Sequence, residues 1–269
     1  ISGNEIQQFA SFLMERLNIT RAEKMEDDEY IVVFKRTTNR LILNEADLIL
    51  ALAQEFQMRT VTVSLEEQSF DSIIQIINRA SILVSMHGAH MITSMFLPRG
   101  AAVIELFPFG VNPEQYTPYK TLASLPGMDL HYVAWRNTLE ENTVTYPDRP
   151  WDQGGIVHLE KEERERILAS KELPRHLCCR NPQWLYRIYQ DTIVDLASFL
   201  QVLRETLKTK RNLKKSQVAS TVHRDRVREP MCHTSVHATH EAQLSVSCQI
   251  PCNLQYLRVK DVKYVHWIQ

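Results

Sequence analysis

Residues 82–107, ILVSMHGAHMITSMFLPRGAAVIELF, hold the pattern that decides the fold of this 269-residue chain. Two short apolar runs, Ile82–Ser85 and Ala102–Phe107, flank a His-Gly turn and a stretch of helical length that ends near Met95. Short apolar runs of this kind are typical of strands buried in a parallel sheet, and strand–helix–strand is the order of a βαβ unit. We therefore expect both runs to be strands of one parallel sheet.

The same alternation continues on both sides of this unit, which gives an α/β fold class. Further strands are predicted at Tyr30–Phe34, Thr60–Ser64 and Leu130–Trp135. Asn44 is a good N-cap for a helix over Glu45–Phe56, which is apolar nearly all round and should be well covered. Other helices are expected after the cap Ser69, at Glu160–Ser170, at Trp184–Tyr189 and at Ile193–Leu207.

The overall composition is that of a globular protein. The chain is 44% hydrophobic and 23% charged, which excludes general disorder, and its 7 Gly and 11 Pro exclude a collagen-like sequence. No run of 18 apolar residues occurs, so no membrane-spanning segment is predicted. A net charge of −1 gives no reason to expect a nucleic-acid partner. Because the chain begins with Ile1 and lacks a signal-peptide pattern, we expect it to be part of a longer protein.

The charge is distributed unevenly along the chain. Residues 208–228 carry eight Lys or Arg and one acid, a local net charge of +7. Few apolar residues and no aromatic residue lie among these charges, so a solvated linker is favoured over a nucleic-acid or membrane patch. After it, Ala242–Ile250 alternates apolar and polar residues as an antiparallel strand does. We predict an α/β domain at 1–207, a basic linker at 208–230 and a truncated β module at 231–269.

The five cysteines and one tripeptide favour a protein that resides in an oxidising compartment. Asn18-Ile19-Thr20 is an N-glycosylation sequon, and we expect the adjacent Cys178 and Cys179 to form disulfides elsewhere rather than with each other. A cluster of Cys and His in the tail contains two zinc-like spacings, His233–His237 and Cys248–Cys252. The pairs run His first, unlike common zinc sites, so no metal site is predicted.

Polar residues follow three of the predicted strands. Arg36 follows the first, Ser85, His87 and Gly88 end or follow the third, and Glu105 lies within the fourth. Since parallel strands end at one edge of the sheet, these side chains should converge where ligands of such sheets bind. Taken singly, each has a simpler explanation, namely a surface salt bridge, a turn, or an acid that faces solvent or a partner.

Together these residue types describe a nucleotide diphosphate site. Gly88 allows close approach to the backbone, and the N-terminus of a following helix attracts anions. Arg36 adds a cationic fork for phosphate oxygens, and Glu105 could accept hydrogen bonds from a ribose diol. Neither GxGxxG nor GxxxxGK[ST] occurs, so dinucleotide-binding and P-loop proteins are excluded.

The segments SMHGA at 85–89, FLPRG at 96–100 and VIE at 103–105 resemble the C-terminal half of the family 61 glycosyltransferases. Longer segments at 30–45, 112–135 and 175–191 extend the resemblance along the chain. It implies an inverting, GT-B-type enzyme of the endoplasmic reticulum membrane, which transfers N-acetylglucosamine from UDP-GlcNAc in a β-1,4 linkage to O-linked mannose on a glycoprotein such as α-dystroglycan. It also implies an N-terminal membrane anchor and a C-terminal fibronectin type III module.

By this resemblance, Arg36 and the His87-Gly88 turn would bind the pyrophosphate, Glu105 the ribose, and no bound metal or other cofactor would be needed. Ser85 belongs to the same donor-binding group. The catalytic base would come from the N-terminal half, so we expect this chain alone to bind donor without turnover. Two alternatives are a transferase that modifies EGF-like domains directly and a non-catalytic nucleotide-sugar-binding protein.

Overall fold

The computed structural model describes residues 1–20, 29–175, 177–206 and 208. The chain divides into two units, Ile1–His223 and Arg224–Gln269, and every described residue lies in the first. The proposed β module at 231–269 and the tail cysteines and histidines lie outside the described residues, as does the linker after residue 208. These assignments stay predictions.

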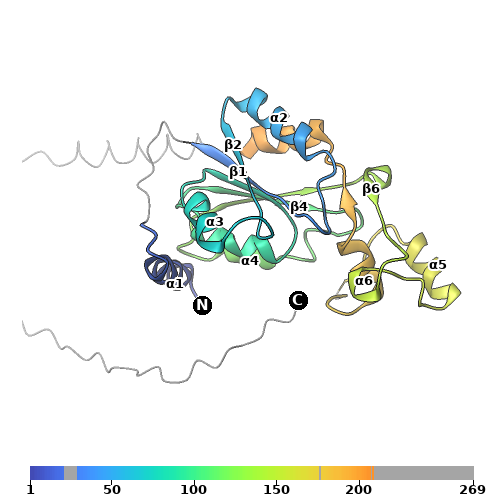
Figure 1. The fold of residues 1–269 in the computed structure, drawn as a ribbon. Coiled ribbons are helices and arrows are strands. Elements are labelled where there is room, and N and C mark those ends of the chain that lie inside the picture. The colour runs from blue at the N-terminus through green and yellow to red at the C-terminus, as the bar shows by residue number, and fades with distance from the viewer. Residues whose placement is uncertain (21–28, 176, 207, 209–269) are drawn as a thin grey trace, which may run out of the picture. The chain divides into compact units, whose positions relative to one another are not determined.

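Five parallel strands form the central sheet (Figure 1), as the sequence predicts. Their spatial order is β2-β1-β3-β4-β5, so the chain leaves β1 towards one edge and returns on the other side at β3. The strands are β1 (Tyr30–Phe34), β2 (Arg59–Val63), β3 (Ile82–Met86), β4 (Ala102–Phe107) and β5 (His131–Arg136).

Helices cover both faces of the sheet, which explains why β1, β3 and β4 are buried along their whole length. One face packs against α2 (Glu45–Phe56) and a helix at 196–206. The other packs against α1 (Gly3–Arg16), α3 (Phe70–Ile77), a 3₁₀ helix η2 (Ala89–Phe96) and α4 (Pro118–Ser124). Figure 1 shows α2 on one side of the sheet and α3 and α4 on the other.

Beyond β5 the chain forms a smaller group of elements beside the sheet (Figure 1). A two-stranded antiparallel ladder pairs residues 143 and 144 with 192 and 191. The helices predicted in this region are confirmed with shifted bounds, and the last one begins at 196, after Asp195, whose Oδ1 accepts a hydrogen bond from Ser198 N at 2.8 Å. The elements are η3 (Glu140–Asn142), β6 (Thr143–Val144), η4 (Trp151–Gln153), α5 (Lys161–Ala169), α6 (Pro182–Ile188) and β7 (Asp191–Thr192).

Three sequence-based expectations about helices were wrong. The segment after Gly88 is a 3₁₀ helix, with Met91 N donating to Gly88 O at 2.9 Å. Helix α2 is covered on one face only, since Leu48 and Leu52 are buried whereas Leu50 is 55% exposed. Asn44 does precede α2, but its side chain bonds to the backbone of Val194 instead of capping the helix.

Helix α1 was not predicted, although its start carries a recognisable signal. The Ser2 and Glu5 side chains form a reciprocal capping box, in which Glu5 N donates to Ser2 Oγ and Ser2 N donates to Glu5 Oε2. Gly3 N also donates to Pro126 O at 2.9 Å, which ties the start of the helix to the loop after α4.

Candidate anion-binding site

The predicted site lies at the topological switch point of the sheet. Strands β1 and β3 are neighbours, and their connections run to opposite sides. In open α/β sheets, ligands bind beyond the carboxyl ends of the strands at this point. Arg36 and Arg40 follow β1, and His87 and Gly88 follow β3, so the structure brings these residues together as the sequence predicts for Arg36, His87 and Gly88.

Two arginines stand at this point without a carboxylate partner. Arg40 Nη1 donates to the carbonyl of His87 at 3.0 Å, and its guanidinium lies 5.0 Å from the ring centroid of Tyr189. Arg36 donates from Nε and Nη2 to Asn39 O and Oδ1, both at 3.0 Å. Among the described residues neither arginine forms a salt bridge, so Arg36 is not the surface ion pair of the simpler explanation.

The positive charge is visible in the acid–base properties of the site, although the nearby carboxylate of Glu66 offsets part of it by opposing the lowering, through burial, of the pKa of Arg36 and of His90. Burial, reinforced by the nearby charge of Arg36, lowers the pKa of Arg40 to about 10. Burial and the same two cations lower the pKa of His90 to about 4. Arg40 Nε and His90 Nδ1 are buried without a hydrogen-bond partner in the structure. Positive charge and unused polar atoms therefore gather at one point, which favours binding of an anion.

Gly88 is needed for the arginines to come this close to the backbone. Its φ of 154° and ψ of 177° lie in a region that is essentially restricted to glycine. A Cβ at this position would lie 2.3 Å from Arg40 Nη1 and 3.4 Å from Arg36 Nη1. Because the following helix is a short 3₁₀ segment, the positive charge here comes from the two side chains rather than from an α-helix terminus.

Glu105 is held inside the protein by two short hydrogen bonds. Its side chain has no exposed surface, and Oε1 lies 2.5 Å from His87 Nδ1. Oε2 accepts a hydrogen bond of 2.5 Å from the Tyr132 hydroxyl, and burial together with the Glu105 charge raises the pKa of Tyr132. Both oxygens of the buried Glu105 carboxylate are thus already engaged within the protein, and the ribose role implied by the resemblance stays a prediction.

The other residues selected from the sequence lie away from the anion-binding surface. Ser85 is buried within β3, and its hydroxyl donates to the carbonyl of Met86 at 3.1 Å. Asn18 is exposed after the end of α1 and lines a cavity with Tyr30 and Arg59, which start β1 and β2. Asn18 is thus at the opposite edge of the sheet. Its accessibility suits the glycosylation prediction, which remains a prediction.

The loop that carries both arginines is anchored to a distant part of the chain. Leu41 N donates to Asp191 Oδ1 at 2.8 Å, and the Tyr146 hydroxyl donates to Asp191 Oδ2 at 2.6 Å. Asn44 exchanges two hydrogen bonds with the backbone of Val194, at 2.8 and 2.9 Å. Asp191 is fully buried, so these bonds fix the end of the loop from inside the protein.

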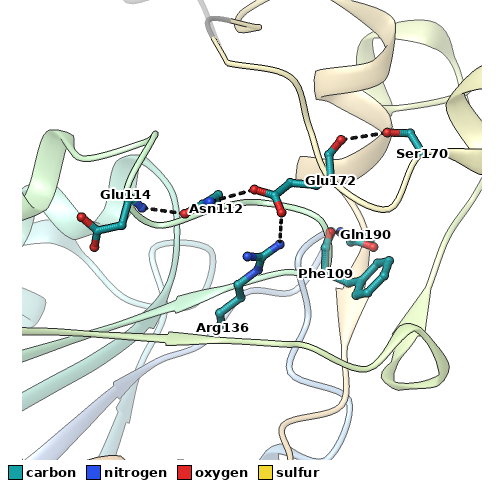
Figure 2. A network of polar contacts seen from close by, with 7 residues as sticks. All are labelled: Phe109, Asn112, Glu114, Arg136, Ser170, Glu172 and Gln190. Atoms are coloured by element: carbon teal, nitrogen blue, oxygen red, sulfur yellow. Dashed lines mark hydrogen bonds and ion pairs between the residues drawn. The ribbon is translucent and has the colours of Figure 1, made fainter.

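Beside the site, a second polar network contrasts with the two arginines. Glu172 accepts hydrogen bonds from Asn112 Nδ2 at 2.7 Å and from Arg136 Nη2 at 3.3 Å (Figure 2). Asn112 Oδ1 in turn accepts from the backbone N–H of Glu114 at 3.0 Å, and Gln190 donates to Phe109 O at 2.6 Å. Arg136 ends β5 and has a carboxylate partner. It therefore lacks the free charge of Arg36 and Arg40.

The cysteines that the structure describes are not joined in a disulfide. Cys178 and Cys179 are exposed free thiols with their Sγ atoms 2.8 Å apart. Within the described ranges, no three His, Cys, Asp or Glu side chains gather as metal ligands would. In the same ranges, no helix has the length and apolar character needed to cross a membrane.

Comparison with known proteins confirms the resemblance seen in the sequence. Residues 1–104 match the family model described as glycosyltransferase 61. Over its full length the chain is 84% identical to protein O-linked-mannose beta-1,4-N-acetylglucosaminyltransferase 2 of Danio rerio. It is 68% identical to the protein of that name in Takifugu rubripes and 60% identical to the one in Homo sapiens. The chain covers 46–48% of these proteins, so it spans about half the length of the curated relatives it matches.

Proposed function

We propose that this chain, which carries glycosyltransferase 61 sequence over residues 1–104, is the donor-binding part of an N-acetylglucosaminyltransferase that acts on O-linked mannose. The observation that carries the proposal is the pair Arg36 and Arg40. Both cations lie beside Gly88, and neither forms a salt bridge with a carboxylate of the described residues. The names of the relatives, which specify the sugar and the O-linked mannose, supply the reaction.

The chemistry of sugar transfer fits a site of this charge. When the acceptor hydroxyl attacks the anomeric carbon of UDP-GlcNAc, the bond to the β-phosphate breaks and negative charge grows on the diphosphate. Guanidinium groups form forked, charge-assisted hydrogen bonds with phosphate oxygens. Fixed cations that face the developing charge stabilise the transition state, and they can do so without a metal ion. Arg36 and Arg40 would have this role.

The remaining features of the proposed enzyme come from the resemblance. We place the chain in an inverting, GT-B-type transferase whose catalytic base lies outside this domain. The acceptor would be an O-mannosylated glycoprotein of the α-dystroglycan kind, and the enzyme would be anchored in the endoplasmic reticulum membrane, facing the lumen. The exposed sequon at Asn18 agrees with a lumenal location. A fibronectin type III module would occupy residues 231–269, outside the described residues.

Binding of UDP by calorimetry tests the donor site. We expect Arg36→Ala and Arg40→Ala each to weaken UDP binding by about 10-fold to 100-fold, the equivalent of one hydrogen bond to a charged group. Arg99→Ala is the matched control, because Arg99 is exposed just before β4, at the opposite edge of the sheet. If Arg36→Ala and Arg40→Ala bind UDP as tightly as Arg99→Ala and the unmodified chain do, the diphosphate role is refuted.

A transfer assay then separates the possible enzymes from a simple binding protein. The full-length protein that contains this chain is incubated with UDP-GlcNAc and either an O-mannosyl peptide or a folded EGF-like domain. We expect transfer to the O-mannosyl peptide only, with Arg40→Ala reducing the rate. Transfer to the EGF-like domain alone, or to neither acceptor, would contradict the proposed function.

A further inference from the structure

A chain of short hydrogen bonds ends at His87, the residue before Gly88. The Tyr132 hydroxyl on β5 donates to Glu105 on β4, and the other oxygen of Glu105 meets Nδ1 of His87 at the end of β3. Two adjacent strands and the residue directly after a third therefore contribute one residue each. Burial of a carboxylate is costly unless its oxygens are hydrogen-bonded, and here both are.

His87 is fixed by its other neighbours as well. Its ring stacks on Phe107 with 4.9 Å between centroids and meets Tyr119 and Trp184 edge to face, at 5.8 and 6.3 Å. The carbonyl of His87 accepts the hydrogen bond from Arg40 Nη1. Arg40 thus holds the backbone carbonyl of His87, and Glu105 together with the three aromatic rings holds its side chain.

The second ring nitrogen of His87 is left for a ligand. Nε2 lies on the opposite side of the ring from Nδ1, and within the described residues it has no hydrogen-bond partner. It is not one of the fully enclosed polar atoms that lack a partner, and 8% of the side chain is exposed. When Nδ1–H is committed to Glu105, a proton on Nε2 has no acceptor inside the described part of the protein, and an anion beside Gly88 could supply one.

We propose that Glu105 is a positioning residue, which accepts from Nδ1–H of His87 and so orients its ring in the doubly protonated, cationic form, whose Nε2–H donates to the diphosphate bound at Arg36 and Arg40. Tyr132 orients Glu105 in the same way, from the other carboxylate oxygen. The identity of the ligand rests on the proposed function, whereas the positioning of His87 does not. Glu105 would then contact no part of the nucleotide, and the ribose hydroxyls would be bound by other residues.

Proton NMR tests the positioning itself, without any ligand. A proton in so short a bond between imidazole and carboxylate resonates far downfield. We expect such a signal in the chain, its loss in His87→Gln, its retention in Arg36→Ala, and an upfield move in Glu105→Gln, where a neutral amide replaces the carboxylate. If Glu105→Gln does not fold, Tyr132→Phe serves instead, since it removes one hydroxyl and should shift the same signal. Absence of the signal in the unmodified chain, or no response to these variants, would overturn the proposal.

A double-mutant cycle on UDP affinity tests how Glu105 acts on the ligand. We expect Glu105→Gln and His87→Gln each to weaken UDP binding about 10-fold. The double variant should bind no more weakly than His87→Gln alone, because Glu105 acts through His87. If the fold-loss of UDP affinity in the double variant equals the product of the two single losses, Glu105 contacts the nucleotide independently of His87 and the proposal is refuted. If the unmodified chain does not bind UDP, the proposed function fails, and the NMR signals alone decide the positioning of His87.

Discussion

Replacement of Gly88 by alanine should damage the donor site through a single carbon atom. The new Cβ would lie 2.3 Å from Arg40 Nη1, well inside contact distance. Arg40 has little room to withdraw, because it is held between the His87 carbonyl and the ring of Tyr189. We expect the guanidinium to move and its hydrogen bond to His87 to break.

The size of the effect follows from two separate contributions. Alanine in the backbone conformation of Gly88 costs about 1–3 kcal/mol of stability. Displacement of Arg40 removes one charged hydrogen-bond donor from the ligand, worth about 1.5–3 kcal/mol, so UDP affinity should fall about 10-fold to 100-fold. The first loss is read from urea denaturation and the second from calorimetry with UDP.

Gly100→Ala is the matched control for this experiment. Gly100 has a φ of 75°, so alanine is strained there too, at a cost of about 1–2 kcal/mol. No atom of the described residues lies within 4 Å of the place that a Cβ would take, and the residue is at the other edge of the sheet, so UDP affinity should not change. If Gly88→Ala binds UDP as tightly as Gly100→Ala does, the reasoning about Arg40 is refuted.

Three further predictions concern the loop that carries the arginines, His90 and the helix at 196–206. Asp191→Asn should cost about 1–3 kcal/mol in urea denaturation and weaken UDP binding, because Leu41 N–H and the Tyr146 hydroxyl lose a charged acceptor; the exposed Asp152→Asn should do neither. His90 has a pKa of about 4 when folded against 6.5 ordinarily, so the unfolded chain gains a proton first as pH falls. Melting temperature should therefore drop between pH 7 and pH 5, and it should drop less in His90→Asn. Phe199→Ala should destabilise the domain by about 3–5 kcal/mol, since this side chain is fully buried against the sheet, whereas Phe9→Ala, at a half-exposed position, should cost far less.

The sheet could be predicted because its central strands are covered on both faces. Burial of β1, β3 and β4 requires continuous apolar runs, and such runs are readable in a single sequence. Helix α1 escaped detection because Phe9 and Phe12 are exposed, which weakens its hydrophobic periodicity. The 3₁₀ geometry after Gly88 depends on tertiary packing around η2, which sequence patterns do not report.

Only part of the candidate site could be predicted from the sequence, namely the residues that directly follow the buried strands. Arg36, His87 and Gly88 stand directly after strands, where the order of the chain fixes the place of each residue. Arg40 reaches the same point only because the loop turns back with a positive φ of 54° at this residue. The partners of Glu105 come from the residue after β3 and from β5, and such contacts between neighbouring strands cannot be derived from its own position in the sequence.

The anchoring of residues 35–44 by Asp191 and Val194 sets a lower limit on the size of a working domain. The sheet is complete at Arg136, so a chain cut after β5 would keep every strand of that sheet and all four residues of the candidate anion-binding site. It would still lack the groups that hold Leu41 and Asn44. A shortened protein would therefore lose both the groups that hold its arginine loop and the helix at 196–206, which covers one face of the sheet.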